Sequence, residues 1–322
     1  MKRLTALLLA LVLMFSLTAC AAPGDVAEDG ELNIVTTIFP LYDWTRVVLG
    51  DNPSQAELTM LLGTGVDLHS YQPTAADLLK LATCDLFIYV GGESDAWVED
   101  ALAEVANQNM IVLNLMDLLG DAAREEETVE GMQAEAEEAD EDEPEYDEHI
   151  WLSLRNAEAL TRAITDALTE LDSSNAEIYA ANASAYLAQL DALDGEYQAA
   201  VDAAAKDTLL FGDRFPFRYL TEDYGLNYYA AFSGCSAESE ASFETIVFLA
   251  DKVDTLNLGT VLTIENSDGR IAQTIIDNTK TKNQSVLAMD SMQGTTAQDV
   301  EAGETYLGIM QRNLDVLKQA LN

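Results

Sequence analysis

The chain has 322 residues, of which 48% are hydrophobic, and a formal net charge of -41 at pH 7. This charge argues against nucleic acids and small anions as ligands, because both need Lys or Arg, and it favours a cationic partner such as a metal ion. The hydrophobic content is sufficient for a sizeable core, and the length indicates two domains or one large α/β domain.

The first residues predict a lipoprotein signal. Two positive residues precede the apolar run 4–17, which is short for a membrane span. The run ends in Leu17-Thr18-Ala19-Cys20, which resembles the bacterial lipoprotein cleavage box. We therefore expect 1–20 to be a signal peptide, Cys20 to carry the lipid anchor at the extracytoplasmic face of the membrane, and 21–30 to be a linker. The alternative is an uncleaved anchor helix.

Strands and helices then alternate along the chain, which predicts mainly parallel sheets covered by helices. The expected strands are 32–38, 57–62, 86–90 and 110–113, and later 208–211, 227–232, 261–264 and 285–288. The expected helices are 74–81 and 95–107, and later 217–224, 242–256, 271–278 and 306–321. The fold class is therefore α/β, with an N-terminal lobe (31–153) and a C-terminal lobe (206–322).

Two segments depart from this alternation. Residues 154–205 have helical spacing, and we expect a long helix that connects the lobes, with Asp172-Ser173-Ser174 as a candidate break. Residues 125–148 are rich in Asp and Glu without Lys or Arg, and they have too little apolar surface to fold, so we expect an acidic loop. Cys84 and Cys235 are expected to be separate thiols, although an exported compartment would permit a disulfide.

The chain has only two histidines, and both lie beside carboxylates. His69 lies in the segment Gly65–Thr74, and His149 follows Asp147 and Glu148. Neutral imidazole is the commonest nitrogen ligand of zinc, so both residues are candidate metal ligands. The alternative for each is an imidazole that is hydrogen-bonded for structural reasons.

From about Leu32 to Leu321 the chain resembles the zinc- and manganese-binding solute-receptor lipoproteins of bacterial ABC importers. The segment 65–74 is similar to the family pattern Gly-x-x-x-His-x-Tyr-x-Pro-Thr, and 149–152 is similar to His-x-Trp-Leu. The other segments that carry the resemblance are 35–42, read as the first strand and turn, 82–91 and 305–313.

The resemblance implies a metal between the lobes, with His69, His149 and Asp290 as ligands. For Asp290 the alternative is a helix N-cap or turn residue. The fourth family ligand is a His or Glu, but here Arg214 falls on that position, and Arg offers only donors. Three outcomes follow. A neighbouring residue supplies the fourth ligand, with Asp213 as the first candidate and Cys235 or Glu238 as the next. Alternatively, the site has three protein ligands and is open to water, or Arg214 pairs with a carboxylate and tight binding of the usual ion is lost.

Two imidazoles with carboxylates suit zinc, and more oxygen ligands would suit manganese. Ligating histidines are usually oriented by an outer shell, for which we name Glu265 and Arg214. The acidic loop is expected to gather divalent cations near His149, and a solvated spacer is the alternative.

The sequence thus predicts a binding protein and not an enzyme. It would be a monomer outside the cytoplasm that captures zinc or manganese and passes it to an ABC permease, with no role in binding nucleic acid. A zinc hydrolase is a weaker reading, because no His-Glu-x-x-His or comparable pairing is present. A third reading is an acidic surface lipoprotein or adhesin that binds a macromolecule, with metal structural or absent.

Overall fold

The computed structural model describes residues 32–50, 56–133, 145–236 and 240–322. The expected signal peptide, the lipidation site Cys20, the linker and Glu238 lie outside these ranges. So does the middle of the acidic loop. Among the described residues, no helix has both the length and the apolar content that a membrane span needs.

The first lobe contains a parallel sheet in the order β2-β1-β3-β4. Its strands are β1 (Leu32–Thr36), β2 (Ala56–Met60), β3 (Leu86–Tyr89) and β4 (Ile111–Asn114). The central strands β1 and β3 are the most buried, as expected for short apolar runs that helices cover on both faces.

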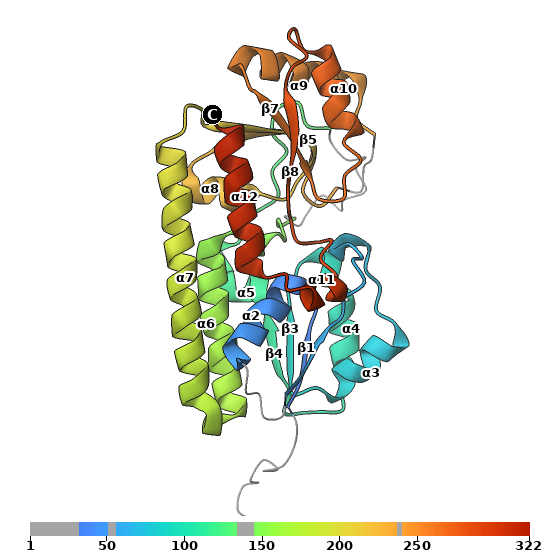
Figure 1. Cartoon of the computed structure of the whole chain (residues 1–322). Helices are drawn as coiled ribbons and strands as arrows, with labels where there is room; N and C mark the ends of the chain where they lie inside the picture. Colours follow the sequence, from blue (N-terminus) through green and yellow to red (C-terminus); the bar gives the residue numbers. More distant parts are fainter. Residues whose placement is uncertain (1–31, 51–55, 134–144, 237–239) are drawn as a thin grey trace, which may run out of the picture. The chain divides into compact units, whose positions relative to one another are not determined.

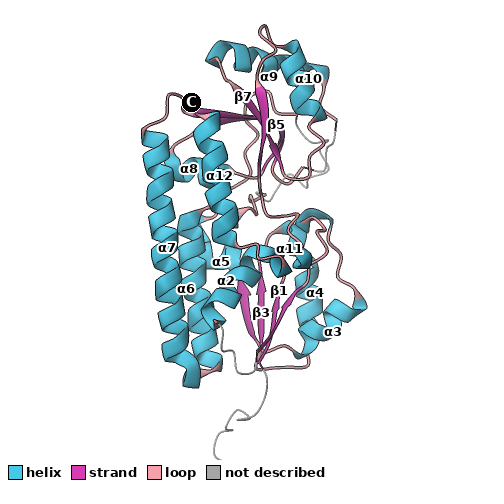
Figure 2. Ribbon diagram, viewed as in Figure 1, coloured by secondary structure: helices cyan, strands magenta, loops and turns pink. Residues whose placement is uncertain are grey.

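The second lobe repeats this arrangement in the order β6-β5-β7-β8, again with parallel pairing (Figure 2). Its strands are β5 (Thr208–Phe215), β6 (Asn227–Ser233), β7 (Thr260–Ile264) and β8 (Ser285–Met289). The prediction of two α/β lobes with parallel sheets is confirmed, and each expected strand is present.

The helices around the sheets mostly match the expected ranges. They are α3 (Ala75–Thr83), α4 (Trp97–Ala103), α5 (Leu115–Leu119), α8 (Arg218–Tyr224), α9 (Phe243–Leu256), α10 (Arg270–Asn278), α11 (Ala297–Glu301) and α12 (Tyr306–Ala320). Three α-helices were not predicted: α5, α11 and α2 (Phe39–Leu49), of which α2 begins where the sequence was read as a turn. Pro40 lies in the first helical turn, where its missing N–H has no partner to lose, so it starts this helix instead of ending a strand.

The connecting segment is two helices, α6 (Leu154–Leu171) and α7 (Ala176–Asp202). They break at Asp172, whose carboxylate accepts hydrogen bonds from Ser174, Asn175 and Tyr179. Figure 1 shows α6 and α7 side by side. The long helix α7 packs against α2 of the first lobe and α8 of the second, so it is the element that connects the lobes.

Tyr306, the first residue of α12, holds three distant segments together. Its backbone N–H donates to Asp43 in α2 at 2.9 Å, and its hydroxyl donates to the backbone oxygen of Trp151 at 2.7 Å. The indole of Trp151 in turn donates to the backbone oxygen of Ser291 at 2.8 Å. These bonds fix the turn after His149 against the loop after β8, and thus one lobe against the other.

Replacing Tyr306 by Phe should destabilise the protein. The change removes the hydroxyl and leaves the buried Trp151 carbonyl without this donor, which costs about 1–3 kcal/mol in the free energy of unfolding. Urea denaturation measures it. Tyr146→Phe, at a tyrosine that is 43% exposed, is the control and should change little. Equal stability of the two variants would contradict this role for Tyr306.

Candidate metal centre

The candidate site lies where strands of both sheets end. His69 follows β2, Arg214 lies near the end of β5, and Cys235 follows β6. The loops after β7 and β8 add Glu265 and Gln293. In open parallel sheets, ligands bind beyond the carboxyl ends of the strands, and here two such edges supply one group of side chains.

His69 is held by its own turn and by the first lobe. It lies in the 3-10 turn Leu68–Ser70, and its backbone N–H donates to the side chain of Asp67 at 3.1 Å. Its ring atom Nδ1 is 2.8 Å from the Ser94 hydroxyl and 3.5 Å from a carboxylate oxygen of Glu148. Because Nδ1 has these oxygen partners, Nε2 is the ring atom left for a ligand.

His149 is fully buried and is held in the same manner. Asp147 accepts from the backbone N–H of His149 at 2.8 Å and contacts the ring atom Nδ1 at 3.0 Å. A carboxylate oxygen accepts, so Nδ1 is the donor in this contact and Nε2 is the ring atom left for a ligand. Carboxylates that orient a ligating histidine in this way are the usual outer shell of a metal site.

The two Nε2 atoms face each other at 3.3 Å. A tetrahedral zinc ion with Zn–N bonds of ~2.0–2.1 Å separates two of its nitrogen ligands by about 3.3–3.4 Å. The spacing between the two imidazoles therefore suits a shared metal ion, and the structure brings the two sequence-predicted histidines together from segments 80 residues apart.

Two further side chains reach this pair. One ligand atom each from His69, His149 and Cys235 lies within 4.8 Å of the others, the only three-member group of this kind among the described residues. The amide of Gln293 lies 3.2 Å from Nε2 of His149, and the side chain is only 8% exposed. Gln293 was missed in the sequence, although its place in the loop after the last strand of the sheet could have singled it out.

The two predicted carboxylate ligands lie outside this three-member group. Asp290 is tied by its backbone to the side chain of Asn313, and its carboxylate accepts from the backbone N–H of Met292. Burial, together with the nearby Glu265 carboxylate, raises the pKa of Asp290 to about 6. Asp213 accepts from the backbone N–H of Arg214. Their role as ligands stays a prediction.

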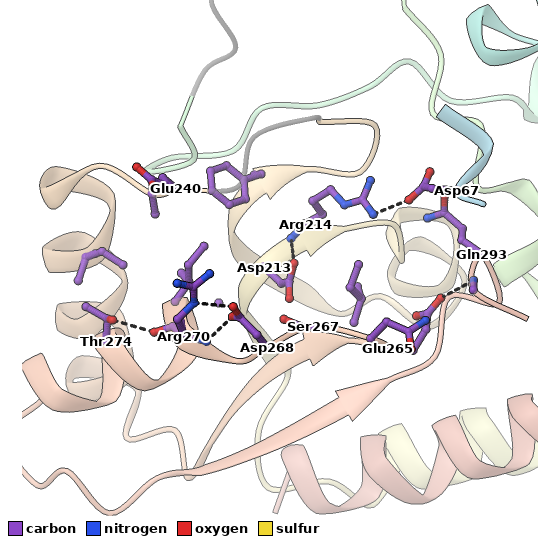
Figure 3. Close-up of a pocket in the computed structure, with 18 of the residues that line it drawn as sticks. Asp67, Asp213, Arg214, Glu240, Glu265, Ser267, Asp268, Arg270, Thr274 and Gln293 are labelled. Atoms are coloured by element: carbon purple, nitrogen blue, oxygen red, sulfur yellow. Dashed lines mark hydrogen bonds and ion pairs between the residues drawn. The ribbon is translucent and has the colours of Figure 1, made fainter. Parts of the chain in front are cut away.

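Arg214 contacts the site through a partner. The pairing of β5 with β6 shifts register between Phe211 and Arg214, a bulge that changes where the following side chains point. The guanidinium lies 2.6 Å from Asp67, the residue that caps the turn of His69 (Figure 3). Burial alone would raise the pKa of Asp67, but Arg214 and His69 outweigh it and hold that pKa below its ordinary value.

Glu265 supports the loop that carries Gln293. Its carboxylate accepts from the backbone N–H and hydroxyl of Ser291 and from the backbone N–H of Gly294. Figure 3 shows it beside Gln293 at the edge of a pocket of about 650 Å³ that Asp213 and Arg214 also line. Glu265 and Arg214, the predicted outer-shell residues, therefore hold the backbone segments that carry the site residues. Their hydrogen bonds go to these segments and not to the histidine rings.

Burial and neighbouring charges keep His69 neutral. Burial, followed by the proximity of His149, lowers the pKa of His69 to about 3. Burial also raises the pKa of Glu148 above its ordinary value. A neutral imidazole is the form that ligates a metal, so His69 needs to lose no proton at neutral pH.

A family model described as the periplasmic zinc-uptake complex component A, ZnuA, matches residues 34–320. The chain belongs to this family. The ZnuA family consists of metal-binding transport components, and the motifs around His69 and His149 lie within the matched range.

Individual relatives agree with this assignment. The chain is 32% identical over 320 residues to the zinc-binding lipoprotein AdcA of Streptococcus pneumoniae serotype 4, covering 99% of the chain and 61% of AdcA. It therefore spans about three fifths of the length of the curated AdcA relatives that it matches. It is 26% identical to the high-affinity zinc uptake system protein ZnuA of Bacillus subtilis, and the match covers 96% of this chain and 97% of that protein.

A solved structure gives the same picture. The Zn(II)-bound ZnuA-like domain of S. pneumoniae AdcA superposes with a TM-score of 0.70 at 28% identity, covering 91% of this chain and 99% of that domain. The matched structure is one domain of AdcA, and 91% of the present chain corresponds to 99% of that domain.

The lowered pKa of His69 predicts how stability depends on pH. In the unfolded chain His69 takes up a proton near pH 6.5, whereas in the folded chain it does so only near pH 3. The unfolded state therefore binds more protons between these values, and stability falls as pH falls, by at most about 1.4 kcal/mol per pH unit from this residue.

The comparison of wild type with His69→Gln isolates this effect. With metal removed by a chelator, the free energy of unfolding of wild type minus that of the variant should decrease from pH 7 to pH 4. Urea denaturation at several pH values measures it. A difference that stays constant or increases on acidification would show that His69 is not held neutral.

Proposed function

We propose that this protein captures a divalent metal ion, with zinc first and manganese as the alternative, and delivers it to an ABC permease. The observation that carries the proposal is the pair of Nε2 atoms 3.3 Å apart, on a buried His149 and a partly buried His69, each on a ring whose Nδ1 contacts an oxygen partner. Membership of the zinc-uptake component A family supports it, because that family supplies metal to transporters.

The proposed site holds the ion through His69 and His149. Two imidazole nitrogens with the sulfur of Cys235 nearby favour zinc, whereas manganese prefers a shell of oxygen ligands. Asp290 or Asp213 would have to move toward the imidazoles to add oxygen ligands. The names of the relatives AdcA and ZnuA, both zinc proteins, also favour zinc.

Anchoring and assembly complete the proposal. A relative named a lipoprotein supports lipid attachment at Cys20 and a place on the outer face of the membrane. We further propose that the protein acts as a monomer, with a connecting region of 154–205 between lobes at 31–153 and 206–322. Mass spectrometry of the membrane fraction would test the lipid.

The acidic segment is proposed to attract cations to the site. Its two ends pair with each other, Glu125 with Tyr146 and the backbone of Glu126 with Glu145. There they line a pocket of about 280 Å³ that also contains His69 and Cys235. The remaining lining residues include Glu93 and Glu148, so the entrance beside the imidazoles is strongly negative.

Substitutions around the imidazoles should lower zinc affinity in a graded order. Asp147→Asn weakens the group that orients His149 and should reduce affinity about 10–100-fold. His149→Ala removes a ligand and should reduce it further. Titration with zinc against a calibrated chelator measures both, and a parallel manganese titration gives the ion preference.

Asp166→Asn, on an exposed position of α6, is the matched control and should leave zinc affinity unchanged. Full zinc affinity in His149→Ala would refute the proposed site. Loss of zinc binding in every folded variant and in wild type would favour the adhesin reading.

The negative charge at this entrance predicts an effect on the rate of zinc association. The double variant Glu93→Gln, Glu145→Gln should slow zinc association and weaken its dependence on ionic strength, because the steering field is smaller. The dissociation rate should change less than the association rate, because steering acts on the approach of the ion. Stopped-flow measurement with a zinc indicator gives both rates. Glu196→Gln, at an exposed position of α7, is the control. Identical association rates would leave the acidic segment as a spacer.

A further inference from the structure

We propose that the sulfur of Cys235 is the third protein ligand of the metal at His69 and His149. The inference rests on the proposed function and deepens it. In the pattern that the chain resembles, this ligand is a His or Glu at the position that Arg214 occupies here. A donor from a different strand end would replace it, and the site would become softer than one built from nitrogen and oxygen alone.

The positions of the three side chains carry the proposal. Their ligand atoms lie within 4.8 Å of one another. A tetrahedral zinc with a Zn–S bond of ~2.3 Å and a Zn–N bond of ~2.0–2.1 Å separates sulfur and nitrogen by about 3.6 Å. Cys235 therefore needs to move by at most about one ångström. It lines the same pocket as His69, so an arriving ion can reach it.

The loop that carries Cys235 is built to approach His149. Gly234 precedes it, and a Cβ at this glycine would lie 3.0 Å from Cε1 and 3.1 Å from Nδ1 of His149, and 2.9 Å from the backbone oxygen of Phe215. Only a residue without a side chain permits this approach. The backbone N–H of Cys235 donates to Glu126 at 3.1 Å, which fixes the residue on the side of the imidazoles.

Gln293 points independently to an ion at this place. Its side-chain oxygen Oε1 is buried and has no hydrogen-bond partner, while Nε2 of the same amide lies 3.2 Å from Nε2 of His149. The two ends of an amide are nearly isosteric, so a half-turn presents Oε1 to the position between the imidazoles. A buried amide oxygen without a partner is unfavourable, and a cation bound by the two histidines would supply one.

The chemistry of this ligand set separates the candidate ions. When the metal–sulfur bond forms, the thiol proton of Cys235 leaves to solvent, and no oxidant or other reactant is needed. Two imidazoles with one thiolate favour zinc and cobalt, whereas manganese prefers oxygen donors. Arg214, which cannot ligate, stays paired with Asp67 at 2.6 Å and supports the turn of His69.

Cobalt(II) titration tests the assignment, because a cobalt–thiolate bond gives an intense near-ultraviolet charge-transfer band that nitrogen and oxygen ligands do not give. Wild type should show this band at one equivalent of cobalt. Cys235→Ser should lose it, and its zinc affinity and its preference for zinc over manganese should each fall about tenfold or more.

Two controls isolate the residue. Cys84→Ser, at a buried thiol in the first lobe that donates to the backbone oxygen of Leu81, should keep the band. So should Cys20→Ser. Circular dichroism checks that Cys235→Ser is folded. Cobalt or zinc binding by wild type without the thiolate band would overturn the role of Cys235 and leave the proposed function standing. No binding of either ion would overturn both.

Discussion

The contact between the Nε2 atoms of His69 and His149, 3.3 Å apart, is the interaction on which the rest of the site depends. Each imidazole contacts an oxygen partner at Nδ1, Ser94 for His69 and Asp147 for His149, so both Nε2 atoms are directed inward. A hydrogen bond between the two rings needs a proton on one Nε2, whereas a cation between the rings can bond to both nitrogens. Burial weakens the alternative for His69, a proton on its ring, because a charged imidazole without water is costly and its pKa is lowered.

The rest of the structure holds this arrangement from several directions. The Tyr306, Trp151 and Ser291 bonds tie the turn after His149 to the loop after β8. Arg214 acts on the other ring through Asp67, which caps the turn of His69. Of the outcomes considered for Arg214 from the sequence, the structure shows the pairing with a carboxylate, and the loss of tight binding that was coupled to it stays a prediction. That pair joins β5 of the second lobe to the first lobe beside the site.

Much of this could be predicted from the sequence, for identifiable reasons. The strands are short apolar runs with a clear period, and the two histidines lie in rare, carboxylate-rich segments. Helix α2 was missed because Pro40 marks either a turn or a helix start, and only packing decides between them. Cys235 ranked behind Asp213 because sequence distance from Arg214 was the guide. The bulge in β5 and the glycine at 234 change which side chain approaches His149, and neither distance nor register can be read from the residues alone. The expectation that Cys84 and Cys235 are separate thiols is confirmed.

The central claim is that His69 and His149 bind one ion together through Nε2. X-ray absorption spectroscopy of the protein loaded with one equivalent of zinc tests it most directly, because imidazole rings give a characteristic outer scattering pattern. The account predicts two imidazole nitrogens at ~2.0–2.1 Å from the zinc. A shell of oxygen atoms without imidazole scattering would contradict it.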